Sequence, residues 1–486
     1  MIGRRDRNKQ SLFIAGDIEQ FIPDDHILKR VDNVLDLSWL HKAVKDCYCQ
    51  DNGRPSIDPE AAVRLMLAGF FQGIIHDRKL MREAQVNIAI RWFAGYELEE
   101  ALPDHSSLSR IRERWGADKF KAIFTRTVQA CIDAGLVGGE TVHLDSTLIR
   151  ADVSWESIVE NHANDVIREN KEDNADDKTP DFPSNKGSRP RTRDNKPKKV
   201  SLTDPEATMA TSSGNYHLEP TYKQHTAVDD KAGILIDIDL TTGEINEGTK
   251  LIEIIERIET ITDKTIKHVT ADKGYAHSVN YKALEQRGTD AIIPPQRDSN
   301  HGKGNLSIRR FKYDGLHQRL VCPGGNALTR SSRAKNGWLY KSRRADCRCC
   351  ALCQQCLPAT AKTRTILIVD GYEALLRARR RKQKGWDGQM KQLYNRHRNL
   401  VEGAHGEAKT QHGLRRAVRR GLFNVAIQVY LTAAVMNLKR LAKASIGPFH
   451  HRFYITKCLA SDIYKALSIF GEKYHFLIRS AYGQHK

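Results

Sequence analysis

The chain of 486 residues lacks any stretch close to the roughly 20 uninterrupted apolar residues that cross a bilayer. Its N-terminus, MIGRRDRNKQ, also lacks the apolar stretch of a secretory signal. Hydrophobic residues still make up 40% of the chain, which is enough for folded domains. We therefore expect a protein of the bacterial cytoplasm that contacts no membrane. At the usual domain size, a chain this long holds about three domains.

Acidic residues are fewer than basic ones: the chain has 59 Asp and Glu and 78 Lys and Arg, which gives a formal net charge of +19. A field of this sign attracts polyanions and releases counterions when phosphates are neutralised. Nucleic acid is therefore the leading partner. Charge alone is also compatible with binding to anionic membranes or with a merely basic protein, so the choice depends on the pattern of candidate sites.

Cysteine is scarce over most of the chain, yet six of the ten cysteines lie between Cys322 and Cys356. In a reducing cytoplasm such clustering favours a metal site over disulfides. The segment CRCCALCQQC (347–356) has repeated two-residue spacings, which suit a tetrahedral site for a soft ion. Zinc is the natural occupant of such a site.

Residues 1–136 are predicted to form an all-helical domain. Asp58 followed by a proline has the pattern of an N-cap and a first helical position, and apolar residues follow at helical spacing. A further helix is predicted for SSLSRIRERW (106–115), which we expect to enter a DNA major groove as a recognition helix. Its three arginines are Arg110, Arg112 and Arg114. A solvated basic face on a bundle helix explains these arginines equally well.

An α/β domain is predicted from residue 137 onward, because the apolar periodicity changes from that of helices to that of strands. Apolar strand segments lead up to Asp145 and to Asp272, and we expect each strand to end near its aspartate. Alternating strands and helices through residue 305 indicate a mixed sheet with helices on both faces. A polar stretch at about 165–215 has too little apolar content to order itself, which predicts a flexible insertion.

The rest of the chain divides into three predicted parts. A cysteine-rich insertion occupies 306–362, the last part of the α/β domain is basic and helical and occupies 363–444, and a C-terminal tail follows at 445–486. Basic residues of the helical part, Arg415 and Arg416 among them, are expected to contact DNA phosphates without reading the base sequence.

Three acidic residues are candidates for a site that cleaves phosphodiesters. Such cleavage needs a stabilised nucleophile and a stabilised leaving oxygen, which two Mg²⁺ or Mn²⁺ ions held by carboxylates provide. Asp145 and Asp272 stand at the expected strand ends, and Glu402 lies in RNLVEGAHGEAK. At 3.6 residues per turn, Arg398 and Lys409 fall close to the helical face of Glu402, so two cations flank the carboxylate. Capping roles for the aspartates and a surface ion-pair ladder for Glu402 are the alternatives.

Together these motifs resemble those of the DDE transposases of bacterial insertion sequences. The resemblance comprises HLDSTLIRA, TADKGY and RNLVEGAHGEAK, followed by NVAIQVYLTAAVMNLKRL, and spans roughly residues 20–442. IPDDHILKRVDNVLD and LPDHSSLSRIRERWG resemble the helical N-terminal domain of one branch. Around its last acidic residue that family has tyrosine, two residues, arginine, three residues, glutamate, six residues and lysine. Arg398, Glu402 and Lys409 fit this spacing, whereas the tyrosine position holds Asn395.

The resemblance implies a ribonuclease H-like catalytic domain in which Asp145, Asp272 and Glu402 bind two Mg²⁺ or Mn²⁺ ions. It also implies binding of double-stranded DNA at terminal inverted repeats, hydrolytic strand cleavage, and attack of a 3'-hydroxyl on target DNA. We expect a homodimer assembled on the DNA. Glu407, which on an ideal helix points roughly 140 degrees away from Glu402, is the weaker candidate for the third ligand.

Similar transposases also carry a cysteine before Pro-Gly, then a pair spaced by two, and one more shortly after. In this chain that set maps onto Cys322, Cys347, Cys350 and Cys356. Cys349 and Cys353 are then spare, although Cys353 can replace one of the four. The resemblance thus implies one structural zinc ion in the cysteine-rich insertion.

Two other functions remain open from the sequence. A ribonuclease H-like nuclease, such as a junction resolvase, would share the carboxylates but would join no strands. A DNA-binding protein with a dead catalytic site is disfavoured by the presence of all three carboxylates. Detection of DNA strand joining, or of inverted repeats that flank the gene, distinguishes a transposase from both.

Overall fold

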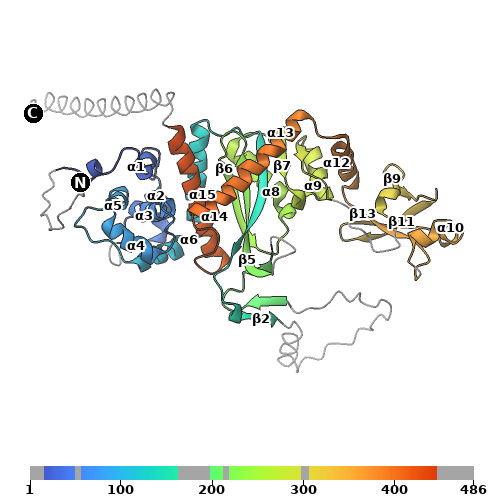
Figure 1. Ribbon diagram of the computed structural model, residues 1–486, viewed down its shortest axis with the longest axis horizontal. Coiled ribbons are helices and arrows are strands. Elements are labelled where there is room, and N and C mark those ends of the chain that lie inside the picture. Colours follow the sequence, from blue (N-terminus) through green and yellow to red (C-terminus); the bar gives the residue numbers. More distant parts are fainter. Residues whose placement is uncertain are drawn as a thin grey trace, which may run out of the picture.

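A computed structural model describes residues 16–49, 56–161, 198–211, 218–296, 306–358 and 360–445. Figure 1 shows a helical N-terminal part, a central sheet with packed helices, and a small sheet at the far end of the molecule. The predicted order, a helical region followed by an α/β region with mixed strands, is confirmed. The predicted C-terminal tail beyond residue 445 and the stretches 162–197 and 212–217 of the predicted insertion lie outside the described residues.

The N-terminal part is helical throughout its described residues. Its elements are η1 (Ile18–Phe21), α1 (Ile27–Asp32), α2 (Leu40–Val44), η2 (Lys45–Cys47), α3 (Pro59–Phe71), α4 (Asp77–Val86), α5 (Ile88–Phe93) and α6 (His105–Asp133). Asp58 caps α3 as predicted, because its carboxylate accepts a hydrogen bond from the N–H of Ala61 at 3.0 Å. Asp104 caps α6 in the same way through the N–H of Ser106 at 2.8 Å. The helix predicted at 106–115 is the first part of α6, which bends at Gly116 because this residue has a non-helical φ of +78°.

The central sheet is mixed. Its strands are β1 (Thr141–Arg150), β4 (Thr208–Ala210), β5 (Glu219–Asp229), β6 (Leu235–Thr242), β7 (His268–Ala271) and β8 (Asp290–Ile292). β5 pairs antiparallel with β1, β6 and β4, whereas β7 pairs parallel with both β1 and β8. β1 therefore lies near the middle of the sheet, and β6 and β7 run in the same direction as β1.

The predicted end of the first strand near Asp145 is wrong. β1 continues to Arg150, because β5 pairs with it over residues 142–150 and supplies partners for its backbone groups. Only the parallel neighbour β7 ends where the sequence suggests, directly before Asp272. Asp145 thus lies inside a long strand, at the position where the pairing with β7 stops.

Part of the stretch predicted to be a flexible insertion is folded, which corrects the range 165–215. β3 (Lys198–Ser201) pairs antiparallel with β2 (Ile158–Asn161), which follows η3 (Trp155–Ser157), and β4 pairs with β5. Asp204 is buried and accepts a hydrogen bond from the hydroxyl of Tyr222 at 2.6 Å. Composition understates the order of this segment because distant residues supply its strand partners and the hydroxyl donor of Tyr222 that binds buried Asp204.

Helices cover both faces of the sheet. They are η4 (Glu247–Lys250), α8 (Leu251–Thr262), η5 (Lys273–Tyr275), α9 (Ser278–Gln286), α12 (Tyr372–Lys384), α13 (Gly388–His397), η7 (Arg398–Glu402), α14 (Gly403–Gln411) and α15 (Leu422–Ala444). Asp237 of β6 bonds to α8, whereas Thr226, which pairs with the next residue Ile238, bonds to His405 of α14 at 3.0 Å. Adjacent strand residues point to opposite faces, so α8 and α14 lie on opposite sides.

α15 is a core helix. It is long and apolar enough to cross a membrane by composition, yet 78% of its most apolar window is buried inside the protein. It packs on α6 and β6, and so joins the helical region to the sheet. The amide of Asn437 binds both the N–H and the C=O of Leu235 at 3.0 and 2.9 Å, which fixes the register of α15 on β6.

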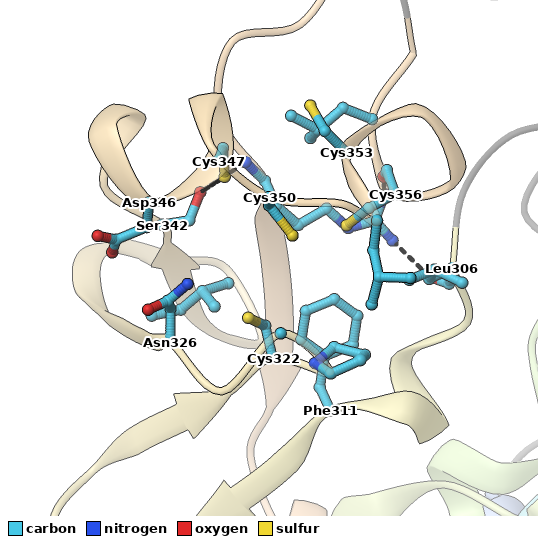
Figure 2. Close-up of a pocket in the computed structure, with 16 residues that line it drawn as sticks. Leu306, Phe311, Cys322, Asn326, Ser342, Asp346, Cys347, Cys350, Cys353 and Cys356 are labelled. Carbon is cyan, nitrogen blue, oxygen red and sulfur yellow. Dashed lines mark hydrogen bonds between the residues drawn. The ribbon is translucent and has the colours of Figure 1, made fainter.

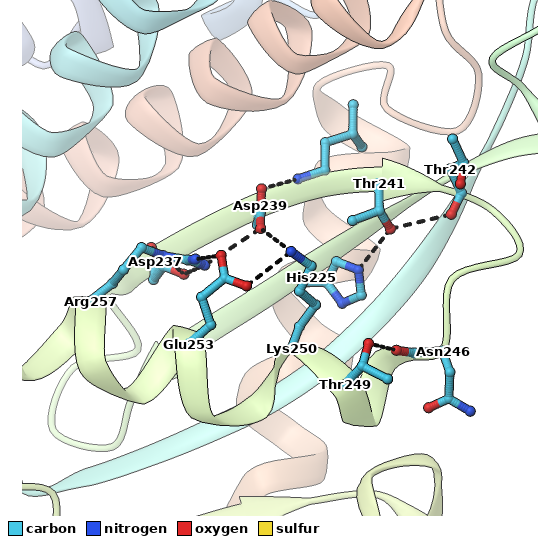
Figure 3. Close-up of polar contacts among 11 residues, drawn as sticks. His225, Asp237, Asp239, Thr241, Thr242, Asn246, Thr249, Lys250, Glu253 and Arg257 are labelled. Carbon is cyan, nitrogen blue, oxygen red and sulfur yellow. Dashed lines mark hydrogen bonds and ion pairs between the residues drawn. The ribbon is translucent and has the colours of Figure 1, made fainter. Parts of the chain in front are cut away.

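Buried ion pairs hold α8 on β6 (Figure 3). Arg257 of α8 donates to both carboxylate oxygens of Asp237, at 3.1 and 2.7 Å. Burial raises the pKa of Asp237, and the bonds from Arg257 oppose that rise. On the neighbouring strand, the Nε2 atom of buried His225 lies 2.9 Å from the hydroxyl of Thr241. Lys250, the last residue of η4, also pairs with Asp239 of β6 at 3.8 Å, which holds the start of α8 against the sheet.

The cysteine-bearing segment forms a separate small sheet, with strands in the order β13-β12-β11-β10-β9. Its elements are η6 (Ile308–Arg310), β9 (Lys312–Asp314), β10 (Arg319–Val321), β11 (Ala327–Ala334), β12 (Gly337–Lys341), α10 (Arg344–Arg348), α11 (Cys353–Cys356) and β13 (Thr365–Val369). Because β13 pairs with β12, this unit extends past the predicted boundary at residue 362.

Candidate active site

Asp145 and Asp272 lie next to each other at one end of the central sheet. The last paired residues of β1 and β7 directly precede the two aspartates, so the parallel register brings them side by side. Both line one cleft of about 760 Å³. Asp145 Oδ1 accepts a hydrogen bond from the N–H of Ser146 at 2.8 Å, and Asp272 Oδ1 accepts one from the N–H of Gly274 at 2.7 Å. The fold therefore brings these two carboxylates together, as the sequence predicts.

The carboxylates of the cleft repel one another. Burial raises the pKa of Asp145 to about 7, although the hydrogen bond from Ser146 opposes the rise. The negative charges of Asp272, Glu247 and Glu402 add to it. Burial also raises the pKa of Asp272, and the charge of Glu247 contributes next. Hard divalent cations bind to oxygen donors of this kind and would relieve the repulsion.

Glu402 lies at the exposed rim of this site. Its side chain is 64% exposed, and its Oε1 atom accepts a hydrogen bond from Arg398 Nε at 3.3 Å. The predicted regular helix through RNLVEGAHGEAK is wrong here, because residues 398–402 form a turn of π-helix. A π turn has more residues than an α turn, so it changes the phase between the residues before it and Lys409 after it. Lys409 lines the cleft, whereas Glu402 is outside its lining.

Glu407 has a structural role. Its carboxylate accepts hydrogen bonds from Lys439 at 2.7 Å and from Arg440 at 3.2 Å, both on α15. These contacts direct it toward α15, and it is outside the lining of the cleft.

Sequence reasoning missed a fourth carboxylate, Glu247, which lines the same cleft. It is the first residue of η4, after the carboxyl end of β6. Since β6 runs in the same direction as β1 and β7, residues that follow it lie at the same end of the sheet as Asp145 and Asp272. An acidic residue after a third strand was the available signal, but the direction of that strand is decided only by tertiary pairing.

The basic residues expected to bind phosphates divide between the cleft and its surroundings. Lys409 and Arg415 line the cleft together with the two aspartates. Burial lowers the pKa of Lys409, and the charge of nearby Arg415 lowers it further. Arg416 is exposed and pairs with Asp152 at 3.6 Å beside the end of β1. Arg398 is exposed at the rim with Glu402.

The predicted recognition helix presents only two of its three arginines to solvent. Arg112 is 2% exposed and donates two hydrogen bonds of 2.7 Å to the carboxylate of Asp77, which also binds Arg419 at 2.5 Å. The prediction that Arg112 contacts DNA is therefore corrected, since its guanidinium joins α6 to Asp77 of α4, which in turn binds Arg419 in the loop before α15. Arg110 and Arg114 are exposed. Residue 112 is about 200° around an α-helix from each of them, so helical geometry alone separates it from that face.

The four cysteines proposed to bind zinc face one small cavity of about 30 Å³ in the cysteine-rich unit (Figure 2). Cys353 also lines this cavity, but its sulfur is turned away in Figure 2, and Cys349 is exposed. Burial raises the pKa of Cys356, and the neighbouring thiols of the set contribute. Cys347 Sγ lies 3.0 Å from the hydroxyl of Ser342.

Neither site is a preformed metal cage. Within the part of the chain that the structure describes, no three His, Cys, Asp or Glu side chains are arranged closely enough to hold a metal ion as they stand. The donor chemistry nevertheless separates the two places. Carboxylate oxygens at the sheet end suit Mg²⁺ or Mn²⁺, and sulfurs in the small unit suit a softer ion.

Two parts of the chain match known protein families. Residues 16–114 match the family described as Transposase domain (DUF772), and residues 321–442 match the family described as Transposase DDE domain. The second match includes Glu402, while Asp145 and Asp272 lie outside both. No curated protein matches the chain.

Among solved structures, the piggyBac transposase synaptic complex with hairpin DNA is similar over 89% of this chain and 83% of that chain, with 10% sequence identity and a TM-score of 0.29. A TM-score this low establishes no common arrangement of the two chains. The two family matches, over residues 16–114 and 321–442, support a DDE-type transposase, an enzyme that cleaves DNA.

Proposed function

We propose that this transposase moves an insertion sequence. It binds the terminal inverted repeats of the element, cleaves DNA by metal-dependent hydrolysis, and joins the 3'-hydroxyl ends to target DNA. The observation that carries the proposal is one cleft in which Asp145 and Asp272 lie beside Lys409 and Arg415. Carboxylates collect divalent cations and basic side chains bind phosphates, so the cleft suits a phosphodiester.

The catalytic domain in this proposal is ribonuclease H-like. Its support is the mixed sheet with β1 near the centre and acidic residues at the matching positions of β1 and β7. The cytoplasm is the expected compartment, with the protein associated with the nucleoid when it is bound to DNA, and a homodimer is the expected assembly on the two ends of the element.

Two Mg²⁺ or Mn²⁺ ions would be held by Asp145, Asp272 and Glu402. The raised pKa of Asp145 fits such a group, because the charges of both other carboxylates contribute to it. When bound, the ions would activate the nucleophile and stabilise the leaving oxygen. Lys409 and Arg415 would bind the phosphates on either side of the cleaved bond and hold the strand in the cleft. Arg398 and Arg416 would hold the DNA outside it.

The N-terminal helical region would recognise the terminal repeats through the exposed face of α6 that carries Arg110 and Arg114. Base-reading arginines give sequence preference, whereas phosphate-binding arginines strengthen binding to all sequences alike.

The cysteine-rich unit would hold one structural zinc ion. The proposed ligands are Cys322, Cys347, Cys350 and Cys356, which face one cavity. Within this unit, few apolar side chains are available for a core, so a metal clip would supply folding free energy that burial cannot.

The proposal is tested by nicking and strand-transfer assays on a terminal-repeat duplex with Mg²⁺. Asp145→Ala, Asp272→Ala and Glu402→Ala each remove a proposed ligand and leave the basic residues in place. DNA binding measured by anisotropy is expected to persist while cleavage and joining fall by orders of magnitude. Full activity in Asp145→Ala or Asp272→Ala contradicts the mechanism. Nicking without any joining by the wild-type protein favours the nuclease instead.

A further inference from the structure

Glu247 occupies a more enclosed position in the cleft than the proposed third ligand does. Its side chain is 22% exposed, compared with 64% for Glu402. The turn η4, which begins with Glu247, is held in place because Asn280 donates a hydrogen bond to the C=O of Gly248 at 2.7 Å and Lys250 pairs with Asp239 of β6 at 3.8 Å.

Both carboxylate oxygens of Glu247 are directed at residues that flank the two aspartates. The hydroxyl of Ser146, which follows Asp145, donates a hydrogen bond to Oε2. Oε1 lies against Gly274, whose N–H binds Asp272. A Cβ atom built on Gly274 would lie 1.6 Å from Glu247 Oε1 and 3.0 Å from Asp272 Oδ1. The carboxylates of Glu247 and Asp272 therefore converge on the same side of Gly274, where the absence of a side chain leaves them room.

Among the described residues, the ion pair of Glu247 with Lys223 is a long one. The nearest cationic atom, Lys223 Nζ, is 3.9 Å from Oε2 and donates its hydrogen bond to the C=O of Ile245 at 2.6 Å. A glutamine would accept the same hydrogen bond from Ser146 without repelling the aspartates. The carboxylate of Glu247 therefore adds a negative charge beside the two aspartates, and a bound cation would offset the repulsion among the three.

We propose that Glu247 is a fourth acidic ligand of the catalytic centre and binds a divalent cation together with Asp272. This inference rests on the proposed function, because it places Glu247 in the same Mg²⁺ or Mn²⁺ site.

The test is Mn²⁺ binding by the full-length protein without DNA, measured by titration calorimetry. Glu247→Gln keeps the shape and the acceptor for Ser146 but removes the charge, and we expect it to weaken the tightest Mn²⁺ site by about tenfold or more. Asp145→Asn and Asp272→Asn serve as references for the proposed site. Glu253→Gln is the matched control, because Glu253 is a glutamate of the adjoining helix α8, is 52% exposed, and lies outside the cleft lining.

A purely structural role for Glu247 is distinguished by Ser146→Ala, which removes the hydrogen bond and keeps all the carboxylates. We expect Ser146→Ala and Glu253→Gln to bind Mn²⁺ as the wild type does. Equal weakening in Ser146→Ala and Glu247→Gln overturns the assignment of Glu247 as a ligand. So does a lower melting temperature of metal-free Glu247→Gln, since relief of repulsion predicts one at least as high as that of the wild type.

The reference variants Asp145→Asn and Asp272→Asn distinguish a failure of this inference from a failure of the proposed function. Wild-type Mn²⁺ affinity in Glu247→Gln, together with its loss in Asp145→Asn and Asp272→Asn, overturns the role of Glu247 and leaves the function standing. Wild-type affinity in all three variants overturns the metal site itself. In the expected result, Mn²⁺ also raises the melting temperature of the wild type by more than that of Glu247→Gln, since at equal concentration a tighter-binding ligand stabilises the fold more.

Discussion

The ion cluster around Glu407 joins α14 to α15, and its contribution to stability follows from its electrostatics. The carboxylate contacts Lys439, Arg440 and the Nε2 atom of His412, the last at 3.6 Å. Burial by itself would raise the pKa of Glu407, but the contact with His412, the hydrogen bond from Lys439 and the positive charges of Arg440 and Lys439 lower it from 4.5 to about 2. The charged carboxylate is therefore strongly preferred in the folded protein.

A pKa lowered to about 2 corresponds to a contribution of about 3 kcal/mol, at roughly 1.4 kcal/mol for each pH unit. Because the folded-state pKa is the lower one, this contribution is fully present above pH of about 4.5 and is lost as the pH falls through about 2. Glu407→Gln keeps the volume of the side chain and removes the charge. We expect it to lower the free energy of unfolding by about 3 kcal/mol at pH 7, and by only about half as much near pH 3.

Urea unfolding of the wild type and of Glu407→Gln, followed by circular dichroism at both pH values, measures this difference. Glu402→Gln is the matched control, because its carboxylate is mostly exposed and pairs only with an exposed arginine. Strand cleavage at a temperature where both proteins are folded is expected to survive in Glu407→Gln. A loss of stability below about 1 kcal/mol, or one that is the same at both pH values, would refute the electrostatic account. Loss of cleavage in a fully folded Glu407→Gln would refute its purely structural role.

Three further changes test other parts of the molecule. Burial raises the pKa of Asp145 to about 7, so its charged form destabilises the folded protein, by an amount that increases as the pH rises above 3.8. In EDTA at pH 8, Asp145→Asn is expected to unfold at a higher temperature, with a gain of at most about 4 kcal/mol that disappears near pH 4. Arg112→Ala removes a buried ion pair and should destabilise the helical region by about 3 kcal/mol in thermal melts, whereas Arg110→Ala should leave stability unchanged and reduce the salt dependence of DNA binding. Metal analysis should find one zinc in the purified protein and in Cys349→Ser, and well below one equivalent in Cys347→Ser; equal zinc in both variants contradicts the proposed ligand set.

Local chemistry explains why much of the architecture was predictable. Asp58 before a proline specifies a helix start without help from distant residues, because its carboxylate reaches an N–H only three residues away. The strands before Asp145 and Asp272 were also predicted correctly, because the apolar pattern of a strand depends on its own burial and not on which strand is its neighbour. Their meeting follows once two parallel strands are assumed to be neighbours, which the order of elements favours.

Tertiary structure decided what depends on neighbours distant in the chain. β1 continues past Asp145 because β5 supplies hydrogen bonds, and residues 198–211 are ordered because they find strand partners and the hydroxyl of Tyr222. Glu247 joins the aspartates because of the direction in which β6 runs, and Gly274 leaves it space. The sequence by itself determined the order of helical and strand regions and which carboxylates are available. Which side chains share a site was decided only by packing, because side-chain electrostatics act over a few ångströms in space and not along the chain.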